Sequence, residues 1–156
     1  MSEGNFDVVI DVPYRVTERI PELMREALRT TFGVIYRKEP REMEAYVLTA
    51  KNHKLEPTVS TGGSSSSSGP GRISAVNGSL TSLAWNLEAM LGKPVVDETG
   101  LTNHYDFQLK WKQEKEEKKP AAEKLVQALR DQLGLDLTPA KRQVEVTVVE
   151  TEPVKD

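Results

Sequence analysis

Two stretches of this chain share the same order of residue types and align without a gap. Residues 26–48, EALRTTFGVIYRKEPREMEAYVL, match residues 127–149, QALRDQLGLDLTPAKRQVEVTVV. Each contains Ala-Leu-Arg, then a glycine that can end a helix (Gly33 or Gly134), then an extended segment. The first extended segment is predicted to turn near Glu39-Pro40, and the second to form another hairpin. The chain therefore holds two related helix–hairpin units, through duplication or through repeated use of the same local chemistry.

Apolar residues at helical spacing predict three amphipathic helices. The first lies within residues 17–32, with Thr17 as a plausible N-cap. The second, residues 80–91, follows the capping residue Ser79, and the third occupies residues 121–133. Trp85 falls just off the apolar stripe of the second helix, so it is expected to pack at the edge of the core.

Period-two alternation predicts the strands. Residues 6–12, FDVVIDV, and residues 104–111, HYDFQLKW, both alternate. In the second, the aromatic and aliphatic side chains face the core and the polar ones face solvent. Two shorter strands are expected in residues 71–78 and 94–96, followed by a turn over residues 97–100.

These elements predict an α+β fold in which three helices pack on a largely antiparallel sheet, in the order βαββ and then βαββαββ. The predicted segments are an N-terminal βαββ unit at 1–51, a flexible Gly/Ser-rich linker at 52–72, a C-terminal unit at 73–150 and a disordered tail at 151–156. All of them fit one compact domain of 156 residues.

Composition excludes several classes of function. Cysteine is absent, which rules out disulfides, thiolate nucleophiles and cysteine-based zinc sites. The net charge is −3 and no basic block interleaved with aromatics occurs, so nucleic acid is not the expected partner. No apolar run is long enough to span a bilayer, and the first residues lack the features of a signal peptide.

The densest group of chemically capable side chains is Asp97, Glu98, His104 and Asp106. Asp97, His104 and Asp106 could serve a metal-dependent or acid–base hydrolase, because carboxylates and imidazole bind cations and transfer protons. The alternation places His104 and Asp106 on the solvent face of a strand, where nothing buries them to tune a pKa. The favoured prediction is therefore a non-catalytic protein with no metal and no cofactor, and the hydrolase is the alternative.

Three stretches resemble a known family. Residues 92–111, GKPVVDETGLTNHYDFQLKW, are close to that family's G-x-P-V-V-D-x-T-G-L-T-G-x-Y-D-F-x-L-x-W, and residues 32–55 and 132–150 match two further motifs. The chain resembles the soil-associated proteins abundant in acidobacteria, domain of unknown function 3738. Tyr36 stands where the first motif usually has His, and Asn103 replaces a Gly of the second. The motif residues, whose role the resemblance leaves open, are Arg37, Arg41, Glu42, Tyr46, Gly92, Pro94, Asp97, Thr99, Gly100, Tyr105, Asp106, Phe107, Trp111 and Gly134.

The resemblance implies a location outside the cytoplasm. Family members usually carry an export signal and an additional N-terminal segment, and some are fused to membrane-bound regulatory metallopeptidases. Residues 72–149 also look like the βαββαβ short N-terminal domain shared by secretins and TonB-dependent receptors. The expected function is a binding module of the cell envelope whose partner is a protein or peptide.

Overall fold

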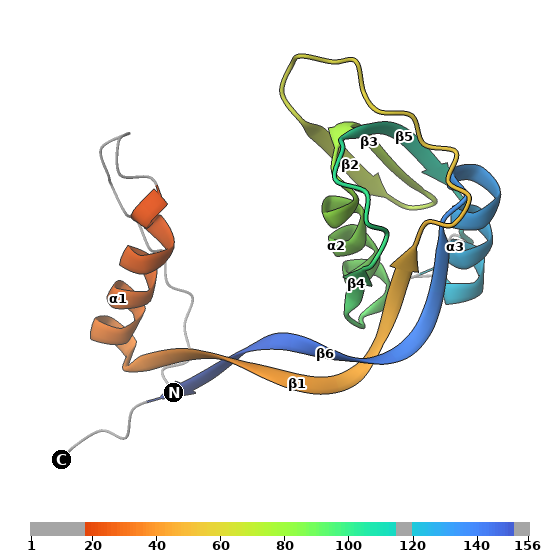
Figure 1. Cartoon of the computed structure of the whole chain (residues 1–156). Coiled ribbons are helices and arrows are strands. Elements are labelled where there is room, and N and C mark those ends of the chain that lie inside the picture. Colours follow the sequence, from red (N-terminus) through yellow and green to blue (C-terminus); the bar gives the residue numbers. More distant parts are fainter. Residues whose placement is uncertain (1–17, 115–119, 152–156) are drawn as a thin grey trace. The chain divides into compact units, whose positions relative to one another are not determined.

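The structure is a computed structural model that describes residues 18–114 and 120–151. The expected strand at residues 6–12, the Thr17 cap and most of the expected tail, residues 152–156, lie outside the described residues. Within them the elements follow in this order: α1 (Ile20–Phe32), β1 (Val34–Thr49), β2 (Ser65–Gly69), β3 (Arg72–Gly78), α2 (Leu80–Leu91), β4 (Val95–Asp97), β5 (Tyr105–Lys110), α3 (Ala122–Ala128), the π-helical turn η2 (Leu129–Leu133) and β6 (Asp136–Thr151) (Figure 1).

The predicted α+β class is confirmed, but the described strands form two sheets rather than one. One sheet has the order β4-β1-β6 and the other β2-β3-β5. The second sheet is antiparallel, whereas β4 runs parallel to the end of β1. Packing divides the chain into unit 1, residues 1–41 and 145–156, and unit 2, residues 42–144, which differs from the expected boundaries at 51 and 73.

Both predicted hairpins are wrong, because each extended segment is one strand of 16 residues. β1 and β6 are neighbours in their sheet and their arrows point in opposite directions (Figure 1). Pro40 lies in β1 before the stretch Tyr46–Leu48 that pairs with β4, and Pro139 lies in the edge strand β6. A proline is tolerated where one side of a strand has no neighbour, so neither proline has to turn the chain.

The expected flexible linker also contains a strand. Ser65–Gly69 forms β2 and pairs antiparallel with β3, from Ser65 opposite Val76 to Gly69 opposite Arg72. Gly71, at a φ of 74°, lets the chain reverse between the two strands. Four serines and a glycine carry no apolar signal, so only backbone pairing with β3 makes this segment a strand.

Unit 2 holds a hydrophobic core that matches the predicted inward faces. Tyr105, Phe107 and Leu109 of β5 are buried while the residues between them are exposed, as the alternation predicted. The α2 stripe is buried as well, and Ser79 accepts a hydrogen bond from Ser82 N at 3.2 Å as its N-cap. Trp85 is an exception: it is 67% exposed, because it projects from the outer face of α2 instead of packing at the core edge.

The third helix ends at Gly134, as predicted, with a φ of 64° at that glycine. Its last turn, η2, is π-helical, which was not predicted. The side chain of Gln132 accepts a hydrogen bond from Lys110 N at 3.0 Å and donates one to Lys110 O at 2.6 Å. This amide pairs with the backbone of β5 as a strand would, which fixes η2 against that strand.

Candidate functional site

The polar residues that follow β4 build a turn. Asp97 Oδ1 accepts hydrogen bonds from Thr99 N at 3.0 Å and from Thr99 Oγ1 at 2.7 Å. Thr99 Oγ1 in turn accepts from Leu101 N at 3.2 Å, and Gly100 has a φ of 69°. The predicted turn over residues 97–100 is confirmed. Asp97, Thr99 and Gly100 of the family motif therefore shape the chain between β4 and β5.

Glu98 ties this turn to β6. Arg142 donates from Nε to Glu98 Oε1 at 2.7 Å and from Nη2 to Glu98 Oε2 at 3.3 Å, a two-bond contact. The hydrogen bond from Arg142 is the main reason that the pKa of Glu98 lies below its ordinary value. Glu98 N also donates to Leu48 O at 2.9 Å, so the residue links β1 and β6.

Asp106 stabilises an irregularity in β3. Its Oδ1 accepts a hydrogen bond from Asn77 N at 2.7 Å, and Asn77 has a φ of 54° within the register shift between Ala75 and Gly78. This bond, and a second one from the Thr58 hydroxyl, hold the pKa of Asp106 below its ordinary value. The carboxylate is exposed and occupied by structural contacts.

His104 is exposed and contributes its backbone carbonyl, which accepts a hydrogen bond from Thr58 N at 2.8 Å. No group of three His, Asp or Glu side chains in residues 18–114 and 120–151 is placed to hold a metal ion. Asp97, His104 and Asp106 therefore form no such group. Asp97 and Asp106 instead accept hydrogen bonds from separate parts of unit 2.

The other motif residues of unit 2 have structural roles: they pair backbone segments, end a helix or let two backbone segments approach closely. Tyr46 N donates to Pro94 O at 2.8 Å, where β4 joins β1, and Gly92 ends α2 at a φ of 68°. Trp111 is half-buried, and its N donates to Gly71 O at 3.0 Å. A Cβ on Gly134 would lie 2.2 Å from Asn52 O, so only glycine fits there.

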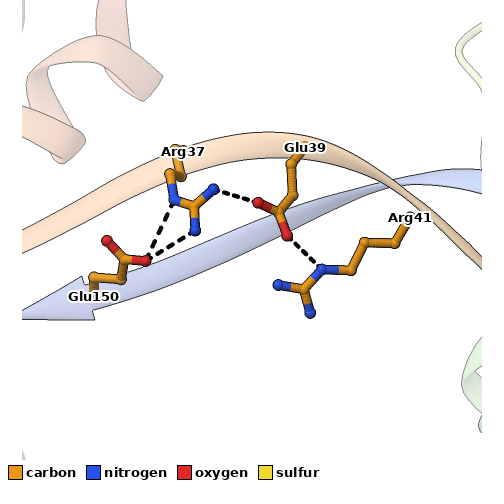
Figure 2. Close-up of polar contacts among 4 residues, drawn as sticks. All are labelled: Arg37, Glu39, Arg41 and Glu150. Carbon is orange, nitrogen blue, oxygen red and sulfur yellow. Dashed lines mark hydrogen bonds and ion pairs between the residues drawn. The ribbon is translucent and has the colours of Figure 1, made fainter.

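The motif arginines Arg37 and Arg41 belong to an ion-pair network in unit 1 (Figure 2). Arg37 donates from Nη2 to Glu150 Oε1 at 3.0 Å, and both arginines also contact Glu39. The hydrogen bond from Arg41 is the largest cause that lowers the pKa of Glu39. Since Arg37 and Glu39 lie on β1 and Glu150 lies on β6, the network joins these two strands. Glu42, the next motif residue, is exposed.

Unit 1 also presents an apolar surface. α1 has no buried residue, although its apolar side chains line one side of the helix. Phe32 is 37% exposed and Val149 is 57% exposed. A hollow of about 320 Å³ lies beside this surface, lined by Arg25, Tyr36, Arg37, Lys38 and Thr147. This surface could not be predicted from the sequence, because the apolar residues of α1 have the same helical spacing as those of a buried helix.

These observations define an α+β protein in which the motif residues Asp97, Thr99 and Asp106 are held in structural contacts and unit 1 presents an apolar helix face. A family model described as "Protein of unknown function (DUF3738)" matches residues 1–151, so the chain belongs to that family. Neither the curated proteins nor the solved structures compared with the chain gave a match. Among the described residues no helix has the length and apolar character needed to cross a bilayer.

Proposed function

We propose that the chain is a non-catalytic interaction module of the bacterial cell envelope that binds a protein or peptide through unit 1. The observation that carries the proposal is the exposed apolar surface of α1 together with the last part of β6. An apolar helix face left open to water is unfavourable by about 25 cal/mol for each Å² of apolar area that a partner could cover. Surfaces of this kind mark sites of association.

The acidic residues that follow β4 and lie on β5 support a structural role rather than a catalytic one. Asp97, Glu98 and Asp106 each accept hydrogen bonds that hold a turn, a strand pair or a bulge. The lowered pKa of Glu98 and of Asp106 keeps both carboxylates ionised near neutral pH, which suits acceptors better than general acids. The place in the envelope is proposed from the resemblance, and the βαββαβ order of β3 to β6 agrees with the secretin-like arrangement.

Site-specific photo-crosslinking tests this function. A benzophenone side chain would replace Phe32 or Val149 in unit 1, and Gln108, which is exposed on β5 of unit 2, would be the matched control. We expect a crosslinked partner in the extracytoplasmic fraction from the first two positions only. Crosslinks from position 108 alone, or none from any position, would contradict the proposal.

A further inference from the structure

β2 is an outer strand of its sheet, and its open side carries no protection. Ser65–Gly69 pairs with β3, and within the described residues no strand and no backbone hydrogen bond reaches its other side (Figure 1). In an antiparallel ladder every second residue of such a strand directs its N–H and C=O outward, so β2 presents a row of unpaired donors and acceptors. Residues 65–68 are exposed serines, and their pairing with β3 has no register shift. The charge, proline or bulge that protects a sheet edge is therefore missing from β2.

The other outer strands of the described sheets are protected. In β5 the side-chain amide of Gln132 occupies the backbone N and O of Lys110. In β4, a strand of three residues, Val95 N donates to Glu88 Oε2 at 3.2 Å. β6 contains Pro139, which lacks the N–H that a further strand would need. Among these outer strands β2 alone offers a regular edge to another strand.

β2 also gains little from the core of unit 2. Ser66 lies opposite Ala75 and Ser68 lies opposite Ile73, and opposite residues point to the same face of a sheet. Ala75 is 6% and Ile73 is 1% exposed, whereas both serines are exposed. The core therefore ends under β3, and β2 is held by backbone pairing on one side. A strand on the open side would pair the backbone groups that β3 leaves unpaired.

The side chains of β2 fit a second copy of the same strand. When two copies of residues 64–68 meet antiparallel about a two-fold axis, serine faces serine wherever these residues overlap. A hydroxyl both donates and accepts, so opposite serines can hydrogen-bond, and no like charges meet although each chain carries a net charge of −3. A strand of another sequence is recognised through pockets for its alternate side chains, and a row of identical short side chains distinguishes none of them.

The pairing would continue the existing sheet. β2-β3-β5 is antiparallel throughout, and a two-fold axis perpendicular to the sheet places two β2 strands antiparallel to each other. With the axis at Ser67 the strands pair over their full length, Ser65 opposite Gly69. The order becomes β5-β3-β2-β2-β3-β5, which is close to the mean sheet size of about 5–6 strands.

From these observations we infer that the chain forms a homodimer through β2, in which the open edges of two copies pair antiparallel about a two-fold axis at Ser67. Each copy contributes a strand of 5 residues, against about 20–30 residues a side in a standard interface, so the dimer is weak and depends on concentration. The inference concerns unit 2 and goes beyond the function proposed for unit 1.

Disulfide trapping tests the geometry, because the chain has no cysteine of its own. Ser65→Cys, Ser66→Cys, Ser67→Cys and Ser68→Cys are oxidised separately, and Gln108→Cys, exposed on β5, is the matched control. At the axis a residue faces its own copy with Cβ atoms about 4.5–5.5 Å apart, which suits a disulfide. Each step away from the axis shifts the two copies of a residue by about 7 Å along the strands. We therefore expect the most efficient trapping at position 67 and none at position 108.

Charge substitution tests the same contact without a covalent bond. In sedimentation velocity at rising concentration, the unchanged chain should pass from 17.4 kDa toward twice that mass. Ser67→Lys and Ser67→Glu each place like charges opposite each other and should raise the dissociation constant of the dimer about ten-fold or more. A mixture of the two variant chains should dimerise again, because opposite charges then face each other. Gln108→Lys is the control and should leave the dissociation constant unchanged.

Three results would overturn the inference. A chain that stays at 17.4 kDa up to the highest concentration that remains in solution makes no such contact. A dimer that Ser67→Lys leaves unchanged, or that Val149→Lys dissociates, pairs through another surface. Equal trapping at all four serine positions would show strands without a fixed two-fold axis. None of these results bears on the crosslinks expected from unit 1, so the proposed function would stand or fall separately.

Discussion

At the scale of single residues, the family motif is explained by local geometry. Asp97 and Thr99 form the turn after β4, Asp106 holds the bulge of β3, and Gly134 lets a neighbouring backbone approach closely. The sequence indicated the turn, because Asx turns follow from residue types two positions apart. It could not indicate the partner of Asp106 or of Gly134, because Asn77 and Asn52 are distant in the chain.

Gly100 and Gly134, which both have a positive φ, should differ in their tolerance of alanine. Gly100→Ala meets no atom within 4 Å, so left-handed strain alone costs about 1–2 kcal/mol. Gly134→Ala adds a clash with the Asn52 carbonyl. Overpacking of this kind lowers the free energy of unfolding by about 1–3 kcal/mol more. Urea unfolding followed by tryptophan fluorescence should rank Gly134→Ala as clearly less stable. Equal midpoints would show that residue 52 moves away without cost.

Glu98 should contribute to stability in a pH-dependent way. The Arg142 hydrogen bond lowers the pKa of Glu98 in the folded chain below its ordinary value near 4.3. Ionised Glu98 therefore stabilises the fold above about pH 4.3, and this stabilisation is lost as the pH falls through the folded pKa. Glu98→Gln should lower the urea midpoint slightly at pH 7, and this difference should shrink as the pH falls below about 4.3. A difference that does not shrink with falling pH would assign the effect to packing.

At the scale of elements, local sequence patterns were sufficient to predict the helices and the half-buried strands. The Ser79 cap, the extent of α2 over Leu80–Leu91 and the alternation of β5 were all predicted and confirmed. The two predicted hairpins were wrong because proline also occurs within strands that have an open side, and the sheet order leaves such a side at Pro40 and Pro139. β2 could not be predicted, because only its pairing with β3 makes this serine-rich segment a strand.

Loss of the α2 cap provides a test at this scale. Ser79→Ala removes the acceptor for Ser82 N and should cost about 1 kcal/mol of unfolding free energy. Ser67→Ala, on the exposed strand β2, is the matched control and should stay within about 0.5 kcal/mol of the unchanged chain. Chemical denaturation of the three proteins would measure both. If Ser79→Ala has no effect, the cap does not stabilise α2.

At the scale of the whole molecule, the repeat contains one covered copy and one open copy of the same apolar pattern. The alignment was visible in the sequence, but the difference in burial was not, because the cover comes from residues between the two copies. Unit 2 has β3, α2, β4 and β5 inserted between its parts, and unit 1 has no described counterpart of them. Exposure therefore depends on topology that the repeated residues do not encode.

Matched truncations should separate the two copies. Leu48→Ala removes a fully buried side chain and should cost about 2–5 kcal/mol. Val149→Ala removes a mostly exposed one at the corresponding position and should cost less than about 0.5 kcal/mol. Thermal unfolding followed by circular dichroism would compare them. A large loss from Val149→Ala would mean that the unbound chain already covers this position.

Hydrogen exchange of the unbound chain, read by mass spectrometry for α1 and for α3 with η2, tests the central claim most directly. Amides protected by a helix exchange when it opens, and each 1.4 kcal/mol of opening free energy slows exchange about ten-fold. The open apolar face predicts that amides of Ile20–Phe32 exchange at least ten-fold faster than the corresponding amides of Ala122–Leu133. Equal protection of the two helices would show that the face of α1 is already covered, and would contradict the account.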